Sequence, residues 1–206
     1  MTGCGCEATA AKTAAQRRTL TVALALNGTM FVVGMIAGVI AQSSGLVADS
    51  LDMLADACAY AIALSAIGRD DQFKARAAWA SGTVLLVLGM GVLFDAARRG
   101  MLGSAPDSAI MMAVATVSLL VNSVVLYLLG QMREDGVHLN ATWIFTKVDV
   151  IANLAVILAG ALVWLGGYWF IDLIVGAGIG LYVIKEAFEI LGSARRAREA
   201  SGLRPR

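Results

Sequence analysis

Apolar residues fill six stretches of the sequence almost completely, and short polar segments separate each stretch from the next. A helix needs about 20 mostly apolar residues to cross a hydrocarbon layer about 30 Å thick. The pattern therefore predicts an all-α membrane protein, a compact bundle of six transmembrane helices. The connecting segments are too short to hold a globular lobe. The predicted spans are 20–41, 46–67, 77–97, 109–129, 141–164 and 169–187.

The composition supports this fold class. Hydrophobic residues make up 59% and charged residues 15% of the 206 residues, whereas roughly 25% of an ordinary soluble domain is charged. A soluble protein is therefore excluded. The 16 basic and 15 acidic residues leave a net charge of +1, so nucleic acid is not expected as a partner. Three cysteines are too few and too unevenly placed for a disulfide framework.

Basic residues are distributed unevenly between the two ends of the predicted spans. Thirteen Lys and Arg fall on the side that carries both termini, and only Arg98 and Arg99 fall on the other. The positive-inside rule then places both termini in the cytoplasm. We expect a multi-pass protein of the plasma membrane, the inner membrane in a bacterium, surrounded by lipid. Residues 1–19 then form a cytoplasmic tail, 20–187 the six-helix domain, and 188–206 a short basic tail in place of a C-terminal domain.

Three aspartates interrupt the second span: Asp49, Asp52 and Asp56. A charge in the bilayer core costs at least about 2.5 to 3.5 kcal/mol, so such residues usually face an interior pathway. At 100° per residue, all three lie on one face of the helix. A rise of about 1.5 Å per residue puts Asp52 about 9 Å and Asp56 about 15 Å deep, near mid-membrane. Asp49 lies near the outer boundary, where a helix cap or an ion pair also explains it.

The fifth span brings a further aspartate to a similar depth. Asp149 lies about 12 Å and Asn153 about 18 Å from the cytoplasmic end, on one face of the helix. Three carboxylates that meet there repel one another unless they are protonated or bridged by a cation. Carboxylates suit hard and borderline divalent ions, and they must lose their protons to bind them. This competition between metal and protons is the minimal chemistry of a metal/proton antiporter.

The sequence resembles the cation diffusion facilitator family of heavy-metal exporters. The resemblance is carried by NGTMFVVGMIAG in the first span, SSGLVADSLDMLADA across the second, and NATWIFTKVDVIANLAVI in the fifth. In that family, two ligands four residues apart on span two and two more on span five form a tetrahedral metal site. The pattern implies that Asp52, Asp56 and Asp149 bind the metal. The fourth position, commonly His in zinc-transporting members, is Phe145, which cannot ligate a metal.

The resemblance also implies a function. It is proton-coupled efflux of a divalent transition metal by alternating access, with the metal as substrate, no permanently bound cofactor, and no enzymatic activity. Asn153, Asp49 or a water could complete the coordination, or the site is three-coordinate. Because the histidine is missing, zinc, cadmium, cobalt, iron and manganese all stay open. Family members are commonly homodimers, so we expect a homodimer here, formed through the transmembrane helices.

Lys147 is a further charge within the fifth span. It lies about 200° around the helix from Asp149, so the two cannot pair directly. One interpretation is a lysine that extends to the cytoplasmic interface. The other is an ammonium group that reaches a carboxylate of another helix and takes part in proton coupling.

Cys4 and Cys6 predict a weak metal-capture site, because two thiols do not complete a coordination shell.

Two other functions fit parts of the same pattern. A non-transporting membrane metal-binding or scaffold protein would keep the bundle and lose a working site at Phe145. An intramembrane aspartyl protease would use two aspartates on separate helices, but no Gly-x-Gly-Asp pattern surrounds Asp149. Among the remaining polar residues, Asn27 and Asn122 predict an interhelical hydrogen bond. Asp172 predicts a solvated charge at the outer interface.

Overall fold

The computed structural model describes residues 4–65, 71–131 and 137–200, and the side chains of residues 14–64, 75–131 and 146–196. Six α-helices account for most of the described residues, which include no strand. The predicted all-α bundle of six helices is confirmed. The helices are α1 (Cys4–Ile40), α2 (Ser44–Ser65), α3 (Asp71–Leu102), α4 (Ser108–Gly130), α5 (Val137–Gly166) and α6 (Phe170–Ala200).

Three helices extend well beyond the apolar stretches that predicted them. α1 begins at Cys4, α3 begins at Asp71, and α6 continues to Ala200. The extension of α1 is rich in alanine, and that of α6 is rich in alanine, arginine and glutamate. These residues have high helix propensity, so the helices continue past the point where their apolar residues end.

Within the described residues, four helices contain a segment long and apolar enough to cross a membrane. These segments are Ala14–Ile40, Ala75–Leu102, Ser108–Gly130 and Thr146–Gly166. α2 and α6 have 22 and 31 residues, and both are long enough at 1.5 Å per residue. They differ from the other four in their charge, since every 18-residue stretch of either helix carries at least three ionisable residues. Within the apolar stretches of the helices, ionisable residues are therefore densest on α2 and α6.

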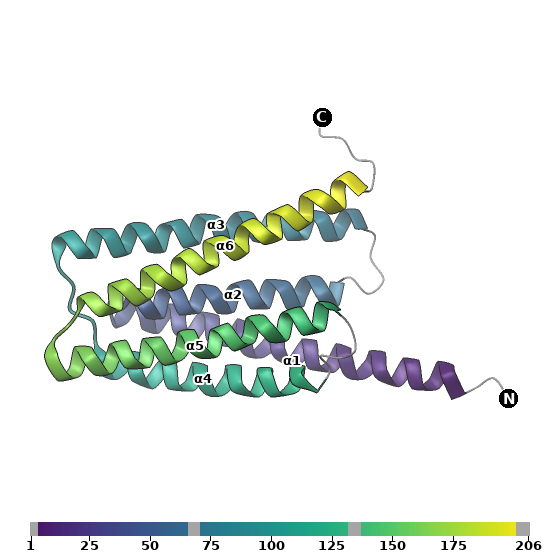
Figure 1. Cartoon of the computed structure of the whole chain (residues 1–206), viewed down its shortest axis with the longest axis horizontal. Coiled ribbons are helices and arrows are strands. Elements are labelled where there is room, and N and C mark those ends of the chain that lie inside the picture. The colour runs from purple at the N-terminus through teal and green to yellow at the C-terminus, as the bar shows by residue number, and fades with distance from the viewer. Residues whose placement is uncertain (1–3, 66–70, 132–136, 201–206) are drawn as a thin grey trace.

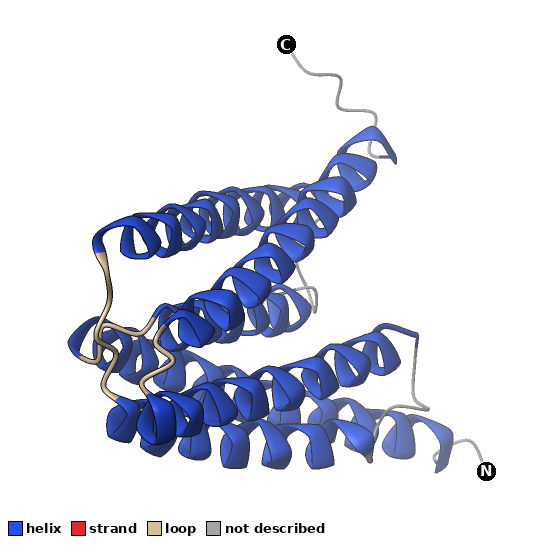
Figure 2. Ribbon diagram, turned by 60° about the vertical axis from the view of Figure 1, so that its left-hand side comes forward, coloured by secondary structure: helices blue, strands red, loops and turns tan. Residues whose placement is uncertain are grey.

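α2 is the central helix of the bundle, because it contacts each of the other five. The most extensive contacts join α3 to α6, α1 to α2, and α4 to α5 (Figure 1). The first turns of α1 and the last turns of α6 lie at the same end of the bundle (Figure 1). Toward that end, α6 diverges from α5 (Figure 2). The central position of α2 accounts for the burial of its three aspartates.

The apolar core surrounds α2, and the outer faces of the helices are also apolar. A soluble protein would place polar residues on these outer faces, whereas a bundle in lipid does not need to. The largest fully buried apolar side chains come from five helices and include Leu46, Leu51, Leu85, Met111, Val156 and Val183. Large apolar side chains that stay exposed include Phe94, Val87, Ile151, Leu158, Ile174 and Leu181.

A residue of α6 caps the first turn of α2. Asp172 is completely buried, and its carboxylate accepts a hydrogen bond of 2.6 Å from the hydroxyl of Ser43. It also accepts hydrogen bonds from the backbone N–H groups of Ser44, at 2.8 Å, and Gly45, at 3.0 Å. These N–H groups would otherwise have no partner at a helix start. The prediction that Asp172 is a solvated interface charge is therefore wrong.

The predicted hydrogen bond between Asn27 and Asn122 is also wrong. Both residues are buried, as a contact between helices requires. However, the Asn27 amide nitrogen donates to the carbonyl oxygen of Ala23 at 3.1 Å, and the Oδ1 atoms of both asparagines have no hydrogen-bond partner. The carbonyl four residues earlier in the same helix takes the donor, which is a common outcome for a polar side chain within a helix.

Candidate metal site

The packing of α2 against α5 sets the level at which their aspartates meet. A Cβ atom placed on Gly45 would lie 3.6 Å from Cγ2 of Val156, so these two residues are at the same height. Asp52 follows Gly45 by seven residues, and Asp149 precedes Val156 by seven. The two helices run in opposite directions, so each aspartate lies about 10.5 Å from this contact on the same side. The predicted meeting of the two spans at one depth is confirmed.

Asp52, Asp56 and Asp149 form a buried carboxylate cluster between α2 and α5. Their exposed fractions are 3%, 7% and 5%. Asp149 lies next to both aspartates of α2, close enough for its carboxyl group to interact directly with each. The Oδ2 atoms of Asp52 and Asp149 are buried without a hydrogen-bond partner. A buried carboxylate oxygen without a partner is costly, so the cluster has unused capacity to accept a proton or a cation.

Tyr60 and Thr146 hold the third carboxylate of the cluster. The hydroxyl of Tyr60 donates a hydrogen bond of 3.0 Å to Oδ2 of Asp56, one helical turn earlier. The same hydroxyl lies 3.3 Å from Oγ1 of Thr146 on α5. Tyr60 and Thr146 are 1% and 0% exposed. Sequence reasoning missed both residues, although the spacing of four between Asp56 and Tyr60 was a usable signal.

Asn153 is positioned as a neighbour of Asp149 on α5. Its amide nitrogen donates to the carbonyl oxygen of Asp149 at 2.8 Å, and its Oδ1 atom is buried without a partner. The carbonyl oxygen of an amide side chain is a ligand for hard divalent ions. Asn153 therefore supplies a further unused oxygen on the face of α5 that carries Asp149.

The other predicted candidates lie elsewhere. Asp49 is 3% exposed and lies near Ser118 of α4, a residue outside the carboxylate cluster. The side chain of Lys147 is exposed, whereas Asp149, two residues away, is buried. This arrangement agrees with the 200° between them and with the interpretation of Lys147 as an interface lysine. The side chains of Cys4, Cys6 and Phe145 lie outside those that the structure describes.

Glu186 of α6 is a fourth acidic residue at the cluster, and sequence reasoning missed it. It is partly buried and lies close enough to Asp52 and Asp56 for their charges to interact. Tyr182, one turn earlier, is next to Glu186, and its buried hydroxyl has no hydrogen-bond partner. Glu186 lies one residue before the end of the predicted span 169–187, and no pattern in the sequence points to a place at the cluster.

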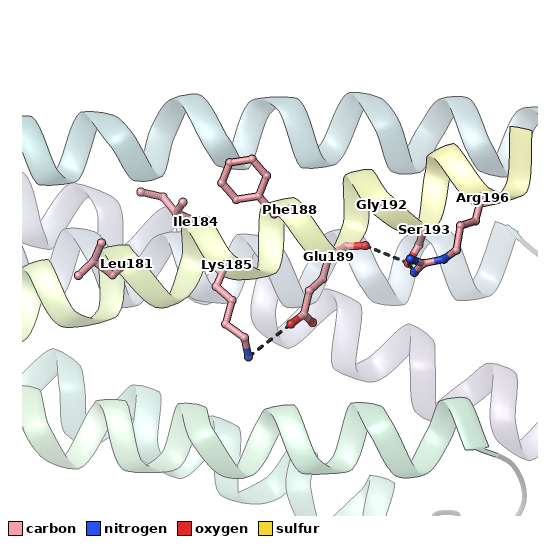
Figure 3. Close-up of a pocket in the computed structure, with 8 residues that line it drawn as sticks. All are labelled: Leu181, Ile184, Lys185, Phe188, Glu189, Gly192, Ser193 and Arg196. Atoms are coloured by element: carbon pink, nitrogen blue, oxygen red, sulfur yellow. Dashed lines mark hydrogen bonds and ion pairs between the residues drawn. The ribbon is translucent and has the colours of Figure 1, made fainter. Parts of the chain in front are cut away.

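A groove of about 750 Å³ runs along a neighbouring face of α6 (Figure 3). Within it, Lys185 forms an ion pair of 3.3 Å with Glu189, and both side chains point away from α3 (Figure 3). Arg196 donates to the hydroxyl of Ser193 in the same groove at 3.0 Å. Two glutamates of α6 therefore differ: Glu189 pairs with a lysine, whereas the charge of Glu186 interacts with those of the α2 carboxylates.

The carboxylate cluster is buried, but its side chains do not form a complete coordination shell. Among the side chains that the structure describes, no three from His, Cys, Asp and Glu are arranged to hold a metal ion as they stand. Two carboxyl groups can share a hydrogen bond only when one of them is protonated. A divalent cation bound between them would take the place of such a proton and draw the oxygens together. The arrangement can therefore exchange protons for a cation.

The chain is similar to known transporters of metal cations. Residues 20–197 match the family model for the cation efflux transmembrane domain. The metal cation efflux system protein CzcD of Cupriavidus metallidurans is 27% identical over 191 residues, which cover 86% of this chain and 60% of that protein. The zinc transporter ZitB of Escherichia coli is 24% identical, over 84% of this chain and 60% of its own length. The chain thus spans about three fifths of the length of these curated relatives.

Proposed function

The chain belongs to the cation efflux family, and from that premise we propose that it exports a divalent transition-metal cation in exchange for protons. The names of CzcD and ZitB assign efflux of metal cations to one relative and transport of zinc to the other. Both names describe transport rather than catalysis, which agrees with the expectation that the chain is not an enzyme.

The observation that carries the proposal is the buried cluster of Asp52, Asp56 and Asp149. These are the deepest acidic residues that α2 and α5 provide. The two helices bring Asp52 and Asp149 to one level, and Asp56 follows one turn further along α2. Two of their oxygens have no hydrogen-bond partner. A bilayer-spanning protein keeps such residues at a cost, and they usually mark an ion pathway.

Proton coupling follows from the chemistry of these ligands. A carboxyl group binds a metal only after it loses its proton, so metal entry releases protons and protonation expels the metal. In the proposed cycle, the cluster takes a metal ion from the cytoplasm and changes access to the opposite side. There, incoming protons neutralise Asp52, Asp56 and Asp149 and displace the ion. The protonated cluster then returns to the cytoplasmic side.

A flux assay with purified protein in proteoliposomes tests this proposal. The vesicles enclose a metal-sensitive dye, and an imposed proton gradient drives uptake of Zn²⁺, Cd²⁺, Co²⁺, Fe²⁺ or Mn²⁺ in separate runs. We expect saturable flux that depends on the gradient, and its loss in Asp56→Asn and Asp149→Asn. Asp107→Asn is the control, because Asp107 is an exposed N-cap of α4 and asparagine also caps helices.

The assay separates efflux from the scaffold function. Flux that persists in both Asp56→Asn and Asp149→Asn would contradict the assigned site. The absence of flux with every ion, together with metal binding that does not depend on Asp52, would favour a non-transporting metal-binding or scaffold protein. The same proposal includes three further expectations. Both termini lie in the cytoplasm, the protein lies in the plasma membrane or the bacterial inner membrane, and it forms a homodimer through its transmembrane helices.

A further inference from the structure

The packing of α6 on α2 places Glu186 at the level of the carboxylate cluster. A Cβ atom on Gly176 would lie 2.6 Å from the carbonyl carbon of Ser44, so the two backbones are in close contact there. Both helices run in the same direction from this contact. Asp52 follows Ser44 by eight residues and Asp56 by twelve, about 12 and 18 Å along the axis. Glu186 follows Gly176 by ten residues, about 15 Å, midway between them.

The rotation of α6 points Glu186 toward the interior of the bundle. Seven residues advance a helix by two turns less about 20°, so Glu186 lies nearly in line with Ile179. Ile179 is 7% exposed and belongs to the core around α2, as does Val183. Glu186 therefore lies on the same side of α6 as these core residues.

Among the side chains that the structure describes, no cation forms an ion pair with Glu186. Its neighbours Asp52 and Asp56 are acidic. The nearby Lys185 forms its ion pair with Glu189, 3.3 Å away, in the groove on the adjacent face (Figure 3). A carboxylate beside two others is unfavourable unless a cation or protons compensate for it. A second observation also points to a bound cation. The Oδ2 atoms of Asp52 and Asp149 are buried and have no hydrogen-bond partner.

We propose that Glu186 is a direct metal ligand, which completes with Asp52, Asp56 and Asp149 a site built from three helices. The inference rests on the proposed function, because it concerns the same ion. It adds α6 to the two helices that the sequence pattern assigned, and it supplies the ligand that Phe145 cannot. Tyr182 is a positioning residue in this scheme, since its unpartnered hydroxyl lies beside the carboxylate of Glu186.

The chemical class of the ion follows from the ligand set. Four carboxylates, with Asn153 nearby, form a site made only of oxygen ligands. Oxygen ligands favour harder divalent ions such as Mn²⁺, whereas imidazole and thiolate favour Zn²⁺ and softer ions. We therefore assign the site to a divalent ion that accepts an all-oxygen shell.

Calorimetric titration of the full chain in lipid nanodiscs with Mn²⁺ and, separately, Zn²⁺ tests the inference. Glu186→Gln keeps the size of the side chain and removes its charge, and Glu189→Gln is the matched control on the same helix. Loss of supporting groups around a metal typically costs about 10- to 100-fold in affinity, so we expect at least about a tenfold loss for Glu186→Gln. Glu189→Gln should bind as the wild type does.

Glu186→His distinguishes direct ligation from an electrostatic effect at a distance. X-ray absorption of bound Zn²⁺ should show a nitrogen ligand that the wild type lacks, and affinity should shift from Mn²⁺ toward Zn²⁺. An unchanged affinity in Glu186→Gln, or a zinc shell without nitrogen in Glu186→His, would overturn the inference. Asp52→Asn separates the two proposals. If metal binding is lost in Asp52→Asn but unchanged in Glu186→Gln, only the role of Glu186 is contradicted. If metal binding is also unchanged in Asp52→Asn, the proposed function is contradicted as well.

Discussion

The carboxylate of Asp172 and the hydroxyl of Ser43, 129 residues apart in the sequence, form a hydrogen bond of 2.6 Å in the interior of the bundle. Through this bond and two further bonds to backbone N–H groups, the start of α6 caps the start of α2. The two helices that carry most of the buried acidic groups are thus fixed to each other at one end. The close contact of Gly176 with Ser44 lies at the same end of the two helices.

Replacement of Asp172 should therefore destabilise the protein strongly. Asp172→Ala leaves the N–H groups of Ser44 and Gly45 buried without partners, and hydrogen bonds to charged groups contribute about 1.5 to 3 kcal/mol each. We expect a clear fall in the thermal unfolding midpoint in detergent. Asp107→Ala is the comparison, since this exposed cap of α4 should cost only about 1 kcal/mol. Equal effects of the two substitutions would contradict a special role for the buried cap.

Removal of the Tyr60 hydroxyl should weaken metal binding without disturbing the fold. Tyr60→Phe takes away the donor of the 3.0 Å hydrogen bond to Asp56, which orients that carboxylate. Outer groups of this kind typically change metal affinity about 10- to 100-fold. Titration calorimetry should show a loss of that order, while the circular dichroism spectrum stays unchanged. Tyr127→Phe, at a side chain that is 69% exposed on α4, should have no effect on affinity.

Metal affinity should rise with pH. At low pH, protons occupy the oxygens of Asp52, Asp56 and Asp149, and the metal must displace them, so apparent affinity falls as protons become more abundant. Binding should therefore release protons into a weakly buffered solution, where an indicator dye detects them. Asp149→Asn removes one titratable ligand and should lower the number of protons released. An affinity that is constant from about pH 5.5 to about pH 8 would contradict proton competition at this site.

The regular rise of a helix explains why part of the site could be predicted. Asp52 and Asp149 are each a fixed number of residues from an end of an apolar stretch, so their common depth follows from the sequence alone. The same reasoning gives the buried face of α2. Both the depth and the buried face depend only on the rise and rotation per residue of a single helix, and the apolar pattern shows where that helix runs.

The sequence pattern within one helix does not predict which residues of different helices meet. Asp49 shares a face of α2 with Asp56, yet it lies near Ser118 of α4, because α2 is surrounded by other helices and one face meets more than one neighbour. Glu186 stands beside the end of the apolar stretch of span six. Its place at the cluster depends on the close backbone contact between Gly176 and Ser44, which no pattern within α6 reveals.

That contact gives a last prediction, which links stability to the metal site. Any side chain at position 176 meets the backbone of Ser44 and Gly45, at 2.6 to 2.8 Å from an added Cβ, so α6 would have to move away from α2. Gly176→Ala should cost about 1 to 3 kcal/mol, as overpacking in a tight interior does. It should also reduce metal affinity, because Glu186 moves with α6. Gly178→Ala is the control: nothing lies within 4 Å of its Cβ, and alanine favours helix by about 1 kcal/mol. Thermal unfolding and calorimetric titration of both variants measure the two effects, and a Gly176→Ala protein as stable as Gly178→Ala would contradict the close approach.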